Sequence, residues 1–416
     1  MHILLIADGR SPTTHTYLRT LYALGLQVSL LSTFPCSEPD GLKSFEVMPV
    51  ALARFAGSQA SAMNTPFRIA GGADKKSFVR KIVTFFRKVA APARYVAGPL
   101  SIAFYKNQYL DTLKRINPDI VHALRIPYEG MLAACTPAGI PLIISIWGND
   151  LTLHAHGSLL MKNLTRKTLQ RADGLIADTR RDIHLARKWG YFEDKPVLVI
   201  PGSGGLDLQA VKQANQAVAN LPEKLLKASR LVVNPRGFRP GSVRNDTFFA
   251  AIPLVLQQLP DTLFACCAMQ GQPEALAWVE RLKIHNDVVL LPYLSQEETW
   301  ALFHTAQVSV SISQHDGTPN SLLEAMACGC FPIAGDIESL REWIQSGQNG
   351  LLVNPVDPQE LAEALVEALT HEELIKNAAR INREIVETRA EKRFVQAQID
   401  EFYRIMENPA NRLSDR

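Results

Sequence analysis

The chain alternates short apolar runs with helical stretches, and it does so twice. Buried strands are predicted in the first half at His2–Ala7, Gln27–Ser32, Asp119–Ala123, Pro141–Ile146, Gly174–Ala177 and Val197–Ile200. A second series is predicted at Leu231–Asn234, Leu263–Ala268, Val288–Leu291, Val308–Ile312 and Phe331–Ala334. Strands separated by helices pair in parallel and carry helices on both faces of the sheet. The sequence therefore predicts an α/β protein with two Rossmann-like, doubly wound domains facing across a cleft.

Polar, Gln- and Ala-rich residues separate the two series. We predict an N-terminal domain at 1–205, with a helical basic insertion at 51–110, and a linker at 206–227. A second domain follows at 228–385, and 386–416 is expected to form a C-terminal helix that packs back on the first domain. A length of 416 residues suits two or three domains of about 150 residues each.

Composition excludes several classes of function. The formal net charge of +3 is too small to indicate a nucleic-acid partner, and the six cysteines lack zinc-ligand spacing. The sequence has no uninterrupted apolar run of about 18 residues, and its first residues lack the basic and small-residue features of a signal peptide. We expect a cytoplasmic protein, free or peripheral at the inner membrane face, with no metal and no bound cofactor.

A glycine-dense stretch, Pro201-Gly-Ser-Gly-Gly205, follows a predicted strand and raises the question of a dinucleotide site. Asp207 stands where the third glycine of G-x-G-x-x-G would be, and the chain contains no P-loop. Nicotinamide, flavin and Walker-type nucleotide binding are therefore not expected. The stretch is either a tight turn or a loop that faces a ligand.

The segment DGTPNSLLEAMACG, residues 316–329, follows a predicted strand and begins a predicted helix. We expect Thr318 to cap this helix and Pro319 to be its first residue. The free N–H groups of Asn320 and Ser321 would then suit an anion, whereas Glu324 would accept hydrogen bonds from hydroxyls. A nucleotide-sugar carries both phosphates and hydroxyls. The alternative is an ordinary capped corner, in which Glu324 only complements the helix dipole.

This segment, followed by Gly335-Asp336, Glu342, Asn349-Gly350 and Pro355, resembles the donor-binding segment of family 4 glycosyltransferases. The resemblance extends to the first half, where landmarks of that family stand in the same order. They are Asn117-Pro-Asp-Ile-Val-His122, Trp147-Gly-Asn-Asp150, Arg171-Ala-Asp173 and Val199-Ile-Pro-Gly202. Only residues 51–110 lie outside the likeness.

The resemblance implies a GT-B fold and a retaining, metal-independent transfer from a nucleotide-sugar donor to a glycan or lipid-linked acceptor. Glu324 would hold the ribose hydroxyls, Asp316 would contact the donor sugar, and Gly317, Thr318, Pro319, Asn320 and Ser321 would offer groups to sugar and phosphate. Arg236 matches the arginine that the family places after the first strand of its second domain. The family's following lysine is absent, so Arg239 or Arg244 would replace it.

The sequence departs from the family pattern at three places. Asp316 replaces the commoner Glu, and Leu124 stands where many members have the second His of His-x-His. Arg125, beside Leu124, could fill that gap. The first loop lacks the family's frequent Gly-Gly pair. Acceptor-side residues are expected to be His15, His122, Arg125 and Asp150.

Residues 75–94 form a predicted basic amphipathic helix with aromatic residues on its apolar side. This pattern is typical of a helix at an anionic membrane surface, and it also suits a surface helix that covers the sheet. We expect a glycosyltransferase that builds a cell-surface polysaccharide or glycolipid. The alternatives are a nucleotide-sugar 2-epimerase of the same architecture and a catalytically inactive GT-B binding protein.

Overall fold

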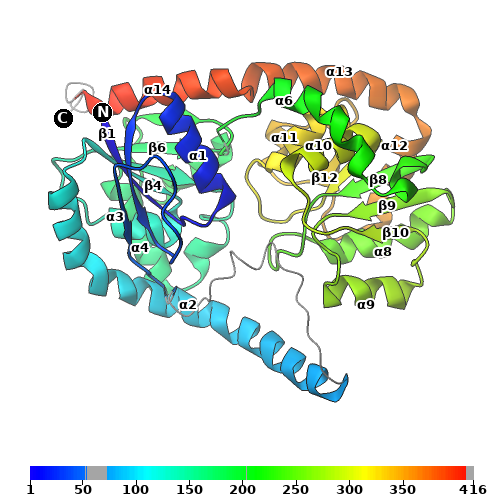
Figure 1. Cartoon of the computed structure of the whole chain (residues 1–416), viewed down its shortest axis with the longest axis horizontal. Helices are drawn as coiled ribbons and strands as arrows, with labels where there is room; N and C mark the ends of the chain where they lie inside the picture. The colour runs from blue at the N-terminus through cyan, green and yellow to red at the C-terminus, as the bar shows by residue number, and fades with distance from the viewer. Residues whose placement is uncertain (52, 54–72, 203, 409–416) are drawn as a thin grey trace. The chain divides into compact units, whose positions relative to one another are not determined.

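The computed structural model describes residues 1–51, 53, 73–202 and 204–408, with the backbone alone for 73–93 (Figure 1). The chain divides into two compact units, which are treated separately below. The N-terminal unit comprises residues 1–178, 182–202 and the chain from 396 onward, and the C-terminal unit comprises 179–181 and 204–395. Both units are α/β, which confirms the predicted fold class.

The N-terminal unit is built on a seven-stranded parallel sheet with the order β3-β2-β1-β4-β5-β6-β7. Its strands are β1 (His2–Ala7), β2 (Gln27–Ser32), β3 (Ser44–Val47), β4 (Ile120–Leu124), β5 (Leu142–Ile146), β6 (Gly174–Ala177) and β7 (Val197–Val199). The chain moves outward from β1 to β3 and then returns on the other side of β1 at β4. In open parallel sheets, ligands bind where the strand order reverses in this way.

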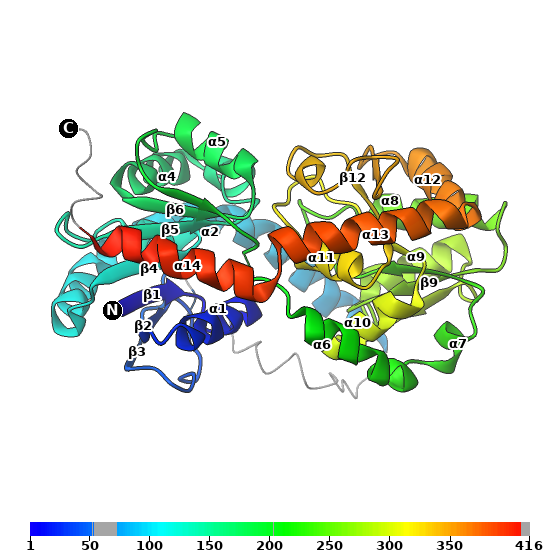
Figure 2. The same ribbon diagram turned by 90° about the horizontal axis from the view of Figure 1, so that it is seen from above.

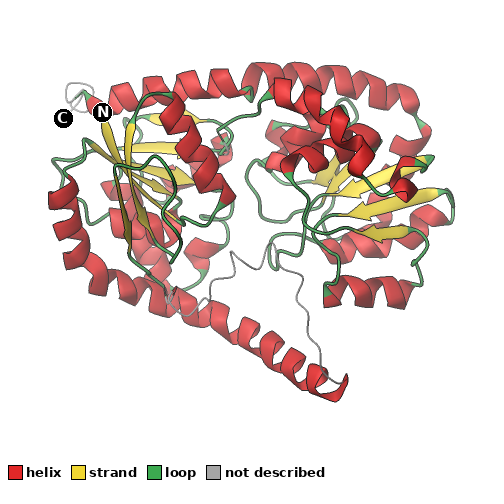
Figure 3. Cartoon of the chain, viewed as in Figure 1, coloured by secondary structure: helices red, strands yellow, loops and turns green. Residues whose placement is uncertain are grey.

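Helices cover both faces of this sheet (Figure 3). They are α1 (Pro12–Ala23), α2 (Ala73–Ile116), α3 (Met131–Ala133), α4 (Leu159–Arg171), α5 (Arg180–Lys188) and the later part of α14 (Lys392–Glu407), with a 3-10 turn at His154–His156. All residues of β1, β4 and β5 are buried, because both sides of a parallel sheet are covered. That is why these strands read as continuous apolar runs.

The C-terminal unit is built on a six-stranded parallel sheet with the order β10-β9-β8-β11-β12-β13. Its strands are β8 (Arg230–Asn234), β9 (Thr262–Cys266), β10 (Val288–Leu290), β11 (Val308–Ser311), β12 (Phe331–Gly335) and β13 (Leu351–Val353). Here the strand order reverses between β8 and β11. The loops that follow these two strands therefore meet at the edge where a ligand is expected.

Helices also pack against the sheet of the C-terminal unit. They are α6 (Leu208–Gln213), α7 (Glu223–Leu226), α8 (Asn245–Leu256), α9 (Pro273–Leu282), α10 (Gln296–Thr305), α11 (Asn320–Ala327), α12 (Pro358–Thr370) and α13 (Glu372–Arg389), with 3-10 turns at Ala214–Asn220 and Leu340–Glu342. Ser295 and Glu298 form a reciprocal capping box at the start of α10. Asp357 caps α12, with Pro358 at the first helical position.

Two segments differ from the sequence expectation. Residues 206–227, predicted as a linker, form helical turns whose Val211, Leu221 and Leu225 are buried in the core of the C-terminal unit. The insertion predicted at 51–110 lies partly outside the described residues, and from Ala73 it continues as the single helix α2 to Ile116. Over the part of the chain that the structure describes, no helix combines the length and apolar character needed to cross a membrane.

The helix α14 lies against β4 and β6 of the N-terminal unit (Figure 2). His122 on β4 is fully buried, and its Nδ1 lies 2.6 Å from the hydroxyl of Tyr403 on α14. Its Nε2 lies 2.8 Å from the hydroxyl of Ser145 on β5. Burial lowers the pKa of His122 to about 3, so the imidazole is neutral and uses both nitrogens in hydrogen bonds.

We expect Tyr403→Phe to lower the free energy of unfolding by about 1–3 kcal/mol, because it leaves a buried imidazole nitrogen without its partner. Urea denaturation of the wild type and the variant measures the difference. Tyr293→Phe is the matched control, since Tyr293 is 60% exposed and its hydroxyl is hydrated. Equal midpoints for Tyr403→Phe and Tyr293→Phe would show that the His122 contact does not stabilise the fold.

Candidate active site

The loop after β8 is fixed by side-chain amides at the reversal of the strand order. The Asn234 side chain accepts a hydrogen bond from the Arg236 N–H at 2.9 Å and donates to Asn245 at 2.9 Å. Asn245 in turn donates to the carbonyl of Gly237 at 3.2 Å. The backbone of residues 234–237 therefore cannot move without breaking buried hydrogen bonds, and this holds the Arg236 side chain in place.

Arg236 forms an ion pair with Asp316, which comes from the loop after β11. The guanidinium Nη2 lies 2.8 Å from Asp316 Oδ2, and the side chains of Arg236 and Asp316 are 5% and 18% exposed. Ser313 donates to the same carboxylate oxygen at 3.0 Å, and the Gly317 N–H donates to the other at 3.1 Å. Among the described residues, Arg236 Nε finds no hydrogen-bond partner although it is buried. The Nε–H group of Arg236 is therefore available to donate a hydrogen bond to an anion.

Arg239 lies close to this ion pair, whereas Arg244 does not join it. The positive charge of Arg236, followed by partial burial, lowers the pKa of Arg239, and Asp316 opposes the shift. The Arg239 residue is nevertheless exposed, so solvent screens much of the repulsion. Arg244 instead forms a bidentate pair with Asp246, at 2.8 and 2.7 Å. Of the two candidates to replace the family's lysine, Arg239 therefore shares the site of Arg236.

The helix α11 begins one residue later than expected, and Thr318 does not cap it. Pro319 occupies the N-cap position, and its ring offers no capping oxygen. Thr318 is buried, and its hydroxyl accepts a hydrogen bond from the Trp343 indole N–H at 2.8 Å. The prediction failed because this partner lies 25 residues away in the sequence. Asn320 and Ser321 are the first two residues of α11, whose N–H groups point out of the helix end.

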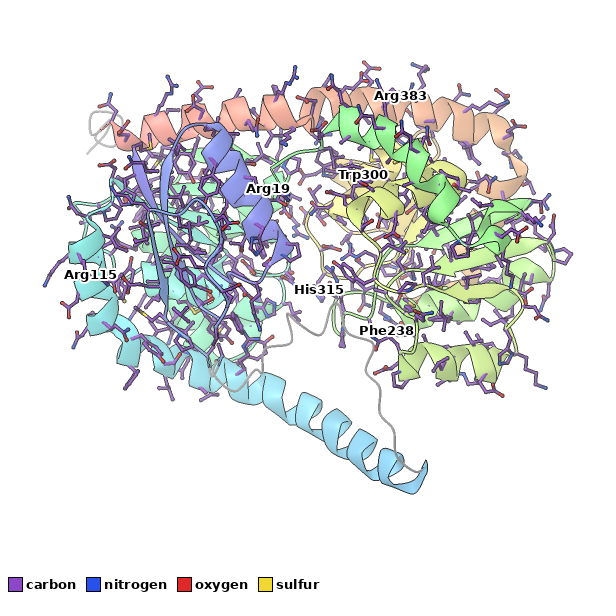
Figure 4. All side chains as sticks on the ribbon, viewed as in Figure 1. Arg19, Arg115, Phe238, Trp300, His315 and Arg383 are labelled. Atoms are coloured by element: carbon purple, nitrogen blue, oxygen red, sulfur yellow. The ribbon has the colours of Figure 1, made fainter. Side chains whose placement is uncertain are left out.

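The start of α11 is suited to a negatively charged group. Gly317 and Pro319 are buried, Asn320 is exposed, and the Ser321 hydroxyl oxygen is buried without a hydrogen-bond partner among the described residues. The helix dipole adds partial positive charge at the same end. His315, labelled in Figure 4, precedes this corner, and its carbonyl accepts a hydrogen bond from Ser242. The corner is thus fastened to the loop that follows β8.

Glu324 lies one turn into α11 on the side that faces α10. Its carboxylate accepts a hydrogen bond from Gln296 Nε2 at 3.1 Å. Burial raises the pKa of Glu324, and the Gln296 amide and the Trp300 indole counteract the shift. Trp300, on α10 (Figure 4), points its N–H toward this carboxylate, although the geometry falls short of a hydrogen bond. The half-buried carboxylate retains acceptor capacity, as a site for hydroxyl groups requires.

In the N-terminal unit, two of the predicted acceptor-side residues do not gather with the others. His122 is fully buried and bound to Ser145 and Tyr403, so it holds α14 instead of contacting a substrate. The sequence could not show this, because Tyr403 lies 281 residues away. His15 is exposed on the first turns of α1.

Arg125 and Asp150, in contrast, meet at the edge where β4 and β5 end. Asp150 is fully buried and accepts hydrogen bonds from Arg125 Nη2 at 3.1 Å and from the N–H of Ile126 at 2.9 Å. Burial raises the pKa of Asp150, and the charge of Arg125 opposes that rise. The guanidinium also lies over the Trp147 ring, 5.5 Å from its centroid. Of the four residues predicted for the acceptor side, Arg125 and Asp150 are therefore the two that the structure brings together.

The turn after β4 adds a carboxylate that the sequence analysis missed. Residues Ile126–Gly130 form a turn closed by a hydrogen bond from the Gly130 N–H to the Arg125 carbonyl. Arg125 and Tyr128 have positive φ angles of 111° and 71°, a strain that often marks functional sites. Glu129 is 3% exposed and accepts a hydrogen bond from Thr33 at 2.6 Å. Glu129 follows the end of β4 by five residues, and this position in the loop after a strand was the signal in the sequence.

At this edge of the N-terminal unit, two arginine side chains lie over aromatic rings. Arg10 lies 3.8 Å from the centroid of the Phe34 ring and pairs with Asp8 at 3.0 Å. Arg94 lies 5.5 Å from the Phe34 centroid and 5.1 Å from that of Tyr128. Guanidinium groups on aromatic faces can bind anions and sugar hydroxyls. The described residues contain no group of three or more His, Cys, Asp or Glu side chains placed to hold a metal.

Two family models match the chain. The model of a glycosyl transferase 4-like domain matches residues 9–202, and the model of glycosyl transferases group 1 matches residues 236–371. Together they cover about four-fifths of the sequence, one in each unit. The second model includes Arg236, Asp316 and Glu324.

Two of the curated relatives are mannosyltransferases by name. The serotype-specific mannosyltransferase WbdA of Escherichia coli is 23% identical over 208 residues, or 49% of this chain and 25% of that protein. The GDP-mannose:cellobiosyl-diphosphopolyprenol alpha-mannosyltransferase of Xanthomonas oryzae pv. oryzae is 25% identical over 268 residues, or 62% of this chain and 66% of that protein. The match thus spans about a quarter of the length of the Escherichia coli relative.

Solved structures share the architecture of the whole chain. HepE of Anabaena in complex with UDP matches with a TM-score of 0.66 and 16% identity, covering 97% of this chain and 100% of that one. The UDP-forming trehalose-phosphate synthase of Burkholderia xenovorans matches with a TM-score of 0.69 and 13% identity, covering 98% and 99%. These likenesses confirm the GT-B fold.

Glu129 should make stability depend on pH in a defined direction. Burial raises its pKa from 4.5 to about 7, so at intermediate pH the folded chain keeps a proton that the unfolded chain releases. The stabilisation of the folded chain by protonated Glu129 is complete below pH 4.5, and it is lost as the pH rises through 7. Relative to wild type, Glu129→Gln should therefore gain about 3 kcal/mol of stability between pH 4.5 and pH 8.

Denaturant unfolding at a series of pH values measures this gain. Glu193→Gln is the control, because Glu193 is a surface carboxylate with a side chain that is 75% exposed. Its stability profile should run parallel to that of the wild type. If the Glu129→Gln profile also runs parallel, Glu129 is ionised in the folded chain.

Proposed function

Because the chain belongs to the GT-B glycosyltransferases that join a 4-like domain to a group 1 domain, we propose that it transfers a sugar from a nucleotide-sugar to a hydroxyl acceptor with retention of configuration. One observation carries the proposal. In the C-terminal unit, Arg236, Arg239 and Asp316 lie at the reversal of the strand order, next to the free end of α11. This arrangement combines positive charge for a diphosphate with oxygen acceptors for hydroxyl groups.

The donor would be held by two kinds of contact. Arg236 and Arg239 bind the diphosphate, and the N–H groups of Asn320 and Ser321 add hydrogen bonds at the helix end. Glu324, half-buried between α10 and α11, accepts hydrogen bonds from the ribose hydroxyls. The HepE structure was solved with UDP, and the Xanthomonas oryzae relative is named for GDP-mannose. We therefore propose a nucleoside diphosphate sugar as the donor.

In the proposed reaction, the acceptor oxygen forms a bond to the anomeric carbon on the face from which the diphosphate departs. The bond between that carbon and the phosphate oxygen breaks, and this oxygen takes the proton of the acceptor hydroxyl. Arg236 and Arg239 stabilise the charge that develops on the leaving group, so the transfer proceeds without a metal. Asp316, held by Ser313 and Gly317, accepts hydrogen bonds from the donor sugar.

The acceptor would bind at the edge of the N-terminal sheet that carries Arg125, Asp150 and Glu129. Two of the relatives named above are mannosyltransferases, and one of them acts on a diphosphopolyprenol-linked sugar. We propose a lipid-linked glycan as the acceptor, in the synthesis of a cell-surface polysaccharide or glycolipid. Arg94, which rests on Phe34 and Tyr128, is placed to meet the phosphate of such an acceptor.

Glu324→Ala should weaken the binding of nucleoside diphosphates by about tenfold to a hundredfold, because hydrogen bonds to a charged acceptor contribute about 1.5–3 kcal/mol each. Isothermal titration calorimetry with UDP and GDP measures the affinity. Glu363→Ala, which removes an exposed carboxylate on α12 of the same unit, is the control. Unchanged affinity in Glu324→Ala would remove the ribose assignment.

Arg236→Ala should lower kcat by about a hundredfold or more and change the donor affinity less, because its contact with the leaving group strengthens in the transition state. Transfer from nucleotide-sugars to a lipid-linked acceptor measures both quantities. NMR of the wild-type product should show the anomeric configuration of the donor. Inversion of that configuration would refute a retaining mechanism.

Arg230→Ala is the matched control for Arg236→Ala. Arg230 also forms an ion pair with an aspartate, Asp261, but it lies at the opposite end of β8. Its loss should leave kcat unchanged. Equal losses of kcat and of donor affinity in Arg236→Ala would place Arg236 in ground-state binding only.

A further inference from the structure

A row of large apolar side chains lies exposed on α2 of the N-terminal unit. Val96, Leu100 and Phe104 are 47%, 60% and 78% exposed. They are spaced four residues apart, which places them on one face of the helix. The opposite face carries Ile102, Tyr105 and Tyr109, which are buried in the core of the unit. The α2 helix is therefore apolar on the outer face as well as on the inner one.

The start of α4 continues this apolar row. Leu159 and Leu160 are 79% and 39% exposed. The Ser158 hydroxyl donates to the Tyr95 carbonyl at 2.7 Å, and Gly157 packs against the Tyr95 ring. These contacts hold the first turn of α4 next to the turn of α2 that carries Val96. We call the five residues Val96, Leu100, Phe104, Leu159 and Leu160 the apolar face.

Basic residues outnumber acidic ones around the apolar face, and the exposed Asp111, two helical turns after Phe104, is paired with Lys114. On α4, Lys162, Arg166 and Lys167 are exposed, and residues 157–172 contain no Asp or Glu. On α2, the exposed Arg94 and Lys106 lie at the two ends of the row, and residues 75–110 contain eight Lys or Arg and no acid. Exposed Leu and Phe side chains flanked by basic charge suit a partner that is negatively charged at its surface and apolar in its interior.

We propose that the apolar face of α2 and α4 docks the N-terminal unit onto a bilayer that contains anionic lipid. Leu100, Phe104 and Leu159 would enter the boundary between headgroups and acyl chains, and the flanking Lys and Arg side chains would contact lipid phosphates. A second copy of the chain suits this face less well, because it would bring two basic surfaces together. The proposal rests on the proposed function, since a lipid-linked acceptor requires the enzyme at the bilayer.

The apolar face is joined directly to the candidate acceptor edge. The Tyr128 hydroxyl donates to the Arg94 carbonyl at 3.0 Å, which ties α2 to the strained turn that carries Glu129. The Tyr95 hydroxyl lies 2.9 Å from Nδ1 of His154, in the loop after Asp150. Docking through α2 therefore places the bilayer next to Arg125 and Glu129. An acceptor whose lipid stays in the bilayer can then present its sugar at this edge.

Co-sedimentation with vesicles tests the proposal. The full chain should bind vesicles of equal parts phosphatidylcholine and phosphatidylglycerol, and it should bind vesicles of phosphatidylcholine alone more weakly. The double variant Leu100→Glu with Phe104→Glu should lower the partition coefficient by about tenfold or more, because apolar burial is lost and charges of the wrong sign are added. Lys162→Glu with Arg166→Glu should abolish the preference for anionic vesicles.

Leu276→Glu is the matched control, because Leu276 is 49% exposed on a helix of the C-terminal unit. It should bind vesicles as the wild type does. Unchanged binding in the Leu100→Glu, Phe104→Glu variant would overturn the proposal. Failure of the wild type to bind anionic vesicles would also overturn it, as would a wild-type dimer that the same variant dissociates without any effect on lipid.

Calorimetry with UDP and GDP on the same variants separates this proposal from the proposed function. If the wild type and all the variants bind a nucleoside diphosphate but none binds vesicles, docking is wrong and the donor assignment stands. If vesicle binding behaves as expected but no nucleoside diphosphate or nucleotide-sugar binds, docking stands and the enzymatic proposal fails. Circular dichroism spectra that match the wild type exclude misfolding as the cause of a loss.

Discussion

Parallel strand pairing is the constraint on which both units depend. A parallel sheet must be connected by crossovers, so every strand in a unit ends at the same edge and every following loop emerges there. In each unit the chain starts inside the sheet, moves outward to one edge and then returns on the other side of its first strand, so that the order reverses between β1 and β4 and between β8 and β11. At each reversal, the two neighbouring strands are not joined by a crossover connection, so no crossover covers the loops that follow them. They are free to carry charged side chains, and Arg125, Arg236 and Asp316 lie on them.

Both units bury an ion pair between arginine and aspartate at this edge. Arg125 pairs with Asp150 in the N-terminal unit, and Arg236 pairs with Asp316 in the C-terminal unit. Burying a charge without a partner costs several kcal/mol, and each ion pair offsets part of that cost. The same pairing leaves part of each guanidinium available, because one aspartate cannot use all of its donors. Charge balance and ligand binding thus depend on the same residues.

Much of the fold could be predicted because its determinants are local. Continuous apolar runs identified eleven of the strands, and the Ser295–Glu298 pair identified the start of α10. The short strands β3 and β13 were missed, and β3, which contains Ser44 and Glu46, has no continuous apolar run. The resemblance alone pointed to Arg236 and Asp316 as site residues, and their ion pair was not predicted. The burial of His122 by Tyr403, and the Trp343 contact that engages Thr318, depend on residues far apart in the sequence.

The contact between His122 and Tyr403 also affects the order in which the chain can fold during synthesis. The strands of the N-terminal unit leave the ribosome before α14, which covers β4 and β6. At about 5–20 residues per second, the 281 residues between these two side chains take tens of seconds or less to appear. Until then the part of the sheet at β4 and β6 lacks the helix that covers it. The C-terminal unit needs no segment from beyond Val395 and can complete its core first. During synthesis, the C-terminal unit can therefore complete its fold before the N-terminal unit does.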